Sequence, residues 1–251
     1  MGSILQLHSR NAGTGDAQSL YDAATAETVT RYTTVTFEDD FTGPGYSTLP
    51  TTATTGFPWI KKLVQTSGAP AVGAVSNAGG GVIRLSLDAT SEKQEGSFYA
   101  ADVLNWDMTK SAVWEARISN HVLPTGNVEF VFGLQSAWVD GPDNASFYAE
   151  FQQSSSGAVN MRTKDGVNTL SGATGVTMVV DAFHIFRLDA TDPTNVRFFI
   201  DGIETSTKGQ LSFAATGASA ILQPYVSAYK ASGTGVGSID IDMVQIGMNR
   251  S

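Results

Sequence analysis

The chain of 251 residues contains no cysteine. This absence excludes a disulfide framework, a thiolate metal site and a cysteine nucleophile, and it fits folding in a reducing cytoplasm. Charged residues are also few, at 16%, and the net charge is -9. No basic cluster exceeds Lys61-Lys62, whereas a nucleic-acid-binding face needs clustered Lys and Arg. We therefore expect no nucleic acid among its partners.

Targeting and membrane signals are absent as well. The N-terminal stretch MGSILQLHSRNAGTGD has no basic region followed by a long apolar segment, and no apolar run has the length of a transmembrane helix. The sequence predicts neither a signal peptide nor a membrane span.

Histidine is scarce, and His8, His121 and His184 lie far apart in the chain. They predict no cluster, and His184 shares a face with Phe186, which favours a structural role. Gly79–Gly81 lacks the Lys-Ser/Thr pair and the following helix of a phosphate-binding loop. These patterns predict no cofactor.

What the chain does have is alternation of apolar and polar residues. In the stretch Phe183–Thr207, His184, Phe186 and Leu188 fall on one face of an extended strand. A turn at Asp192–Asn195 and a second at Asp201-Gly202 divide this stretch into three strands, because Asp-Gly tolerates the positive φ of a tight hairpin. The stretch predicts an antiparallel sheet.

Similar stretches recur along the chain after residue 36, as about a dozen strands spaced roughly 8 to 14 residues apart. Val128–Trp138 is almost continuously apolar, which is typical of a central strand covered on both faces. Gln210–Phe213 is predicted as a short strand, and Gly68–Gly81 as a loop. No helical period and no internal repeat follow residue 36. The pattern predicts one all-β domain, a two-sheet sandwich or a barrel.

Four segments together resemble the concanavalin A-like lectin/glucanase family, which includes laminin-G-like modules. They are FEDDFTG at 37–43, VWEARIS at 113–119, FHIFRLDA with VRFFIDGIE at 183–190 and 196–204, and SIDIDMVQI at 238–246. The resemblance covers roughly residues 37–249 and implies a two-sheet antiparallel jelly roll. It marks a fold, from which function does not follow.

Residues 1–36 differ in composition, with Ala, Thr, Gly and Ser dominating. We divide the chain into an N-terminal arm, 1–36, and a jelly-roll domain, 37–251. The arm is expected to be extended or partly helical, with Asp16 or Ser19 capping a short helix over Leu20–Glu27. Two interpretations stay open: a disordered leader, or an arm that becomes ordered on a neighbouring subunit.

Retaining glucanases of this fold carry Glu-x-Asp-x-x-Glu on one strand, which places two carboxyl groups about 5 to 5.5 Å apart. This chain lacks the motif, because the strands around Glu115, Glu129 and Glu150 each supply one carboxylate. Asp240 and Asp242 are spaced i, i+2, but lie in the last strand, where solvent-facing acids are ordinary. No catalytic residue is assigned, and we expect a protein that is not an enzyme.

Two further sites are candidates. Trp138 and Tyr148 are the best placed aromatic residues to stack on a sugar ring, although a Trp in a sandwich more often packs in the core. Asp140, Asp143 and Asn144 could bind Ca²⁺ through oxygen atoms, while the alternative is a turn with Asx residues. We favour the turn and assign no metal.

Composition, leader and missing catalytic acids favour a structural virion protein, such as a phage capsid decoration or head-tail accessory protein. Its expected partners are the major capsid protein and copies of itself, as a homo-oligomer that could be a trimer, and its location is the virion, after synthesis in the host cytoplasm. The alternative is a carbohydrate- or receptor-binding module of a tail fibre or cell surface, with a host glycan as partner. A glycoside hydrolase is the third hypothesis.

Overall fold

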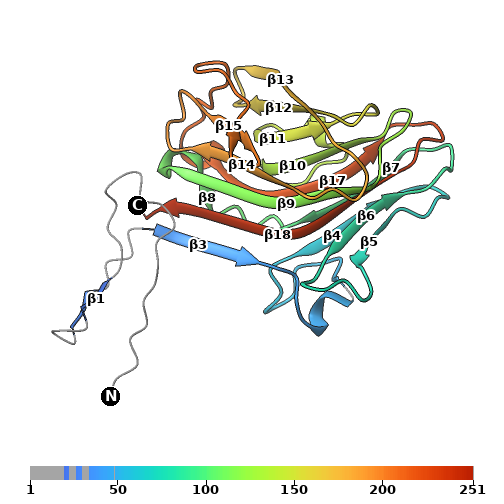
Figure 1. Cartoon of the computed structure of the whole chain (residues 1–251), viewed down its shortest axis with the longest axis horizontal. Coiled ribbons are helices and arrows are strands. Elements are labelled where there is room, and N and C mark those ends of the chain that lie inside the picture. Colours follow the sequence, from blue (N-terminus) through green and yellow to red (C-terminus); the bar gives the residue numbers. More distant parts are fainter. Residues whose placement is uncertain (1–19, 23–26, 30–33, 48, 251) are drawn as a thin grey trace.

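The computed structural model describes residues 20–22, 27–29, 34–47 and 49–250. They form an all-β sandwich in which two antiparallel sheets pack face to face (Figure 1). The first sheet has the order β13 (Thr169–Thr177), β12 (Ala158–Lys164), β11 (Tyr148–Gln153), β10 (Glu129–Gln135), β17 (Ile221–Lys230), β7 (Gln94–Tyr99) and β4 (Ile60–Val64), with β8 (Trp106–Asp107) paired to β17.

The second sheet packs against the first. Its order is β16 (Ile203–Glu204), β15 (Arg197–Ile200), β14 (His184–Ala190), β9 (Ala112–Val122), β18 (Gly237–Asn249), β6 (Ile83–Leu87) and β5 (Ala71–Ala74), with β3 (Thr34–Asp39) paired to β18. The helical segments of the described residues are short 3₁₀ turns, η1 (Pro44–Ser47), η2 (Met108–Lys110), η3 (Pro142–Asn144) and η4 (Gly217–Ala220).

The core between the sheets is built by the predicted alternation. Every second side chain points inward, and aromatic rings meet edge to face at the centre: Phe132, Phe151, Phe186 and Phe198. Each of these rings is fully buried, and such pairs add stability beyond their buried area. The predicted jelly-roll sandwich is therefore confirmed.

The predicted three-strand stretch is confirmed as β14, β15 and β16. Asp201 and Gly202 form the hairpin turn with φ of 52° and 80°, as a type I′ turn requires. His184 lies at the start of β14, where its Nδ1 is 2.7 Å from Asp201 Oδ2 and fastens this turn. Its role in the described structure is structural, as predicted.

Three local predictions are wrong. Leu20–Glu27 was expected to be helical, but β1 (Leu20–Asp22) and β2 (Glu27–Val29) pair as an antiparallel hairpin, in keeping with the aromatic and β-branched residues there. Gln210–Phe213 is not a strand; its backbone makes isolated bonds to the 193–196 turn. Gly68–Gly81 contains β5, because Val72 fills a core position.

The first and last strands of the sandwich, β3 and β18, pair with each other. β3 lies alongside the last strand, with Thr34 opposite Asn249 and Phe37 opposite Ile246 (Figure 1). The sandwich thus includes residues from Thr34 onward. The remaining expectations for the arm, including its caps at Asp16 and Ser19, lie outside the described residues.

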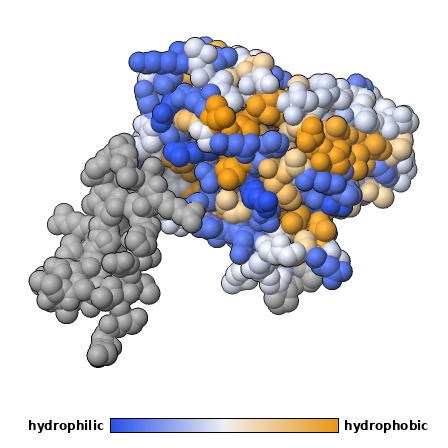
Figure 2. Space-filling view, viewed as in Figure 1, coloured by the Kyte–Doolittle hydropathy of each residue, from blue (hydrophilic) through white to orange (hydrophobic). Residues whose placement is uncertain are grey.

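In Figure 2, apolar and hydrophilic residues are interspersed over the face that Figure 1 presents. On the outer face of the second sheet, charged residues neutralise one another in cross-strand pairs, Arg84 with Asp240, Arg117 with Asp242, and Asp189 with both Arg187 and Arg197. Such pairs keep an exposed sheet face soluble and add little stability.

Candidate functional site

The outer face of the first sheet, which points away from the core, holds the densest polar network of the described residues. On β10 this face presents Glu129, Val131, Gly133 and Gln135, since Phe130, Phe132 and Leu134 point into the core. The strand register places Gly133 between Glu150 of β11 and Tyr225 of β17. Side chains from five neighbouring strands therefore converge on one surface.

Glu95 of β7, the strand next to the edge strand β4, lies on this surface and is fully buried. Its carboxylate accepts hydrogen bonds from Ser97 Oγ, from Tyr225 Oη at 3.0 Å, from Trp138 Nε1 at 3.1 Å and from the Gly141 backbone N–H at 2.9 Å. Burial raises the pKa of the Tyr225 phenol well above its ordinary value. A buried carboxylate needs this many donors because desolvation of an unpaired charge is costly.

The donors from Trp138 and Gly141 belong to the β10–β11 loop, residues 136–147, which folds back over the sheet. Two ion pairs tie its tip down, Lys93 with Asp140 and Arg162 with Asp143. The loop explains why Val131, Gly133 and Gln135 are buried although they face away from the core. The predicted central strand is confirmed as β10, and this loop covers its outer face at Val131, Gly133 and Gln135, while Glu129 stays partly exposed.

Beneath the loop edge, Glu150 and Arg162 form a buried pair across β11 and β12, with Arg162 Nη2 2.5 Å from Glu150 Oε1. Burial outweighs the attraction of Arg162 and raises the pKa of Glu150 to about 7. Glu150 Oε2, Arg162 Nε and both polar atoms of Gln135 are buried without a protein partner. Such atoms mark a place where water or a polar ligand completes the bonding.

A strip of this face beside the loop stays partly exposed. We call it the polar strip: Tyr229 of β17, Glu129 of β10, Gln152 of β11 and Asn160 of β12, all partly exposed. Glu129 pairs in register with Tyr229, Gln152 Nε2 donates to Glu129 Oε2 at 2.5 Å, and Gln152 pairs with Asn160. Burial, and then the charge of Asp143, raise the pKa of Glu129.

The two acids of this face that the sequence offered, Glu129 and Glu150, lie far apart along the strand. Glu150 lies opposite Gly133, four positions along β10 from Glu129, which separates their Cα atoms by roughly 13 Å along the strand. A retaining pair needs about 5.5 Å and an inverting pair about 6.5 to 9.5 Å between carboxyl groups. Glu115 lies on the second sheet, opposite Arg187. The acids that the sequence offered are thus divided between two sheets.

The structure gives the predicted sugar-stacking residues neighbours of their own. Trp138 is half-buried, packs beside Tyr225 and has Lys62 Nζ over its ring at 4.9 Å. Tyr148 is buried, with the guanidinium of Arg162 5.1 Å from its ring centre. Both lie on the candidate face, and a cationic side chain lies over one side of each ring. Stacking of a sugar on them stays a prediction.

The candidate calcium residues engage other groups. Asp140 pairs with Lys93, Asp143 pairs with Arg162, and Asn144 Nδ2 donates to the Asp140 carbonyl at 2.7 Å. Over the described residues, no three His, Cys, Asp or Glu side chains come together as a metal site. Gly141 with Pro142–Asn144 forms the turn that the alternative interpretation described.

Sequence reasoning did not single out Glu95, Arg162 or the polar strip. A usable signal existed at Gln152 and Asn160, since both alternate with core residues on their strands. What the alternation could not tell is which outer face the loop would cover.

Known proteins resemble this chain in structure but not in sequence. An endo-1,3-β-glucanase from Streptomyces sioyaensis matches with a TM-score of 0.57 at 12% identity, covering 90% of this chain and 100% of the other. A pseudo β-1,3-glucanase of Mycobacterium tuberculosis matches at 0.55 and 16%, covering 86% and 98%. The carbohydrate recognition domain of Emp46p matches at 0.51 and 12%, covering 80% and 96%.

The chain has the concanavalin A-like jelly-roll fold. At these identities the likeness concerns the fold alone, as the resemblance of the four sequence segments also implied. No protein-family model matches the chain, and no curated protein sequence matches it either. No helix among the described residues has the length and apolar character to cross a membrane.

Proposed function

We propose that the protein is a non-catalytic glycan-binding module and that the polar strip contacts the sugar. The carrying observation is the composition of that strip: the partly exposed Tyr229 lies beside a carboxylate and two amides on the same face as Glu95. Planar amide and carboxylate groups suit the paired hydroxyls of a pyranose, and an aromatic ring suits its apolar face.

The fold comparisons support this choice of ligand class. A carbohydrate recognition domain and two proteins named as a glucanase and a pseudo-glucanase share the architecture. The proposal that the module is non-catalytic rests on the missing Glu-x-Asp-x-x-Glu motif and on the separation of Glu129 from Glu150 along the strand. We expect no release of reducing sugar from β-glucans, and a release that Glu129→Gln abolishes would favour the hydrolase hypothesis instead.

A glycan array probed with the full chain tests the proposal, and calorimetry on the best hit measures affinity. Gln152→Ala and Tyr229→Ala should each weaken binding at least tenfold, because each removes a group of the strip. Gln245→Ala is the matched control, since Gln245 is a partly exposed residue of β18, paired with Glu115 on the outer side of the second sheet. A flat array, or equal losses in all three variants, would refute the assignment.

The virion role, the capsid partner and the homo-oligomer stay predictions from composition and leader. None of the similar structures named above is a virion protein. A tail-fibre or cell-surface module would be compatible with glycan binding, and the strip is the part of the chain that such a role would use.

A further inference from the structure

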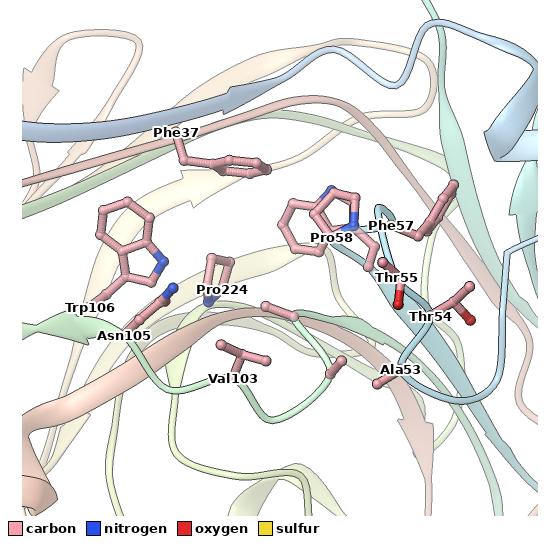
Figure 3. Close-up of a pocket in the computed structure, with 13 residues that line it drawn as sticks. Phe37, Ala53, Thr54, Thr55, Phe57, Pro58, Val103, Asn105, Trp106 and Pro224 are labelled. Carbon is pink, nitrogen blue, oxygen red and sulfur yellow. The ribbon is translucent and has the colours of Figure 1, made fainter.

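A cavity of 410 Å³ lies at one edge of the sandwich, away from the polar strip. Its walls come from β3, from the segments 53–59 and 100–106, and from β17. Figure 3 shows Trp106 and Phe37 on one side, Phe57 and Pro58 on the other, and Val103 with Pro224 between them. The cavity thus opens where the strand pair of β3 meets the first sheet.

The lining is almost entirely apolar and contains no charged side chain. Its polar members are two threonines and Asn105. Val103 at this cavity is 56% exposed, an unusual position for a valine beside buried aromatic residues. A cavity of this volume and polarity fits aliphatic side chains or a small apolar molecule, and offers little to a sugar or an ion.

The N-terminal leader supplies matching side chains. Among residues 1–19, the one aliphatic cluster is Ile4–Leu7. In an extended segment Leu5 and Leu7 point to the same side, so both can enter one cavity. The other residues of 8–19 are mostly small or polar and would gain little by burial.

The first strand of the sandwich, β3, also lines the cavity. Phe37 in the cavity wall is three positions from Thr34, where the sandwich starts. Residues 20–29 carry the β1–β2 hairpin, so residues 8–19 are the connection between the Ile4–Leu7 segment and that hairpin. A flexible linker of twelve residues has a mean span of roughly 20 Å. A tethered segment acts at an effective concentration in the millimolar range. The segment should therefore bind the cavity of its own chain in preference to the cavity of another molecule.

We propose that this cavity is the docking site for the Ile4–Leu7 segment of the same chain, with Leu5 and Leu7 inserted between Trp106 and Phe57. The docked segment would cover Val103 and close the edge of the sandwich. This inference is independent of glycan binding, because it uses other residues and another face.

The cysteine-free chain permits a direct crosslinking test. Leu5→Cys combined with Val103→Cys should form an intramolecular disulfide under mild oxidation, seen as a fast-migrating monomer on a non-reducing gel and as a linked peptide by mass spectrometry. The control pair is Leu5→Cys with Val167→Cys, since Val167 is 87% exposed in the turn between β12 and β13. We expect at least tenfold faster linkage in the first pair.

Equal linkage rates in the two pairs would overturn the proposal, and so would a product that is a crosslinked dimer, which would place the segment on a second copy. A second measurement avoids the cysteines. The double variant Leu5→Ser, Leu7→Ser should bind the apolar dye 8-anilinonaphthalene-1-sulfonate several-fold more strongly than the unmodified chain. Unchanged dye fluorescence would contradict docking.

Discussion

Glu150 makes the stability of this protein depend on pH near neutrality. Burial raises the pKa of the Glu150 carboxyl group from 4.5 to about 7, because it outweighs the attraction of Arg162. The folded state therefore binds a proton more tightly than the unfolded chain does. The stabilisation that this group contributes is fully present below about pH 4.5 and is lost as the pH rises through about 7.

The size of the effect follows from the pKa difference. Each pKa unit corresponds to about 1.4 kcal/mol, so the free energy of unfolding should lose about 3 kcal/mol through Glu150 between pH 4 and pH 8. Glu150→Gln removes the titration and keeps the shape of the side chain. Between pH 4 and pH 8, the free energy of unfolding of the variant should therefore rise by about that amount relative to the free energy of unfolding of the unmodified protein.

Urea unfolding followed by tryptophan fluorescence, at pH values from 4 to 8, measures the difference directly. The charged groups that face Glu150, namely Arg162, Asp143 and Glu129, are present in both proteins, so their contributions largely cancel in the comparison. Parallel pH profiles for the two proteins would refute the argument that burial, rather than the pairing with Arg162, controls this carboxyl group.

Three further changes test other parts of the structure. Lys230→Met should lower the free energy of unfolding by about 3 kcal/mol, because the buried ammonium donates to three backbone carbonyls, whereas Lys93→Met on the surface should leave the urea midpoint nearly unchanged. Gly133→Ala should cost more than about 2 kcal/mol in the same assay, since a Cβ there would lie 2.6 Å from the Ala149 carbonyl oxygen. Arg162→Met should raise the pKa of Glu150 further, so the loss of stability should shift to higher pH. An unshifted pH profile would contradict the pairing of Arg162 with Glu150.

The fold followed from local patterns. The alternation in β14, the Asp201-Gly202 turn and the apolar β10 are each decided by neighbours within a few residues, so they could be predicted. The prediction of a short helix over Leu20–Glu27 was wrong because a weak capping signal competed with β-forming residues. β5 was missed because a single core valine, Val72, among small residues gives almost no periodic signal.

The candidate site was a different matter. The sequence by itself determined that Glu129, Gln152 and Asn160 stand on outer faces of strands, because side-chain direction alternates with a period of two. Only the tertiary structure decided that Glu95 would be buried, since its donors Trp138 and Tyr225 lie 43 and 130 positions further along the chain. Contacts of that range depend on how the strands are ordered and where a loop returns, and no local pattern of residues encodes either.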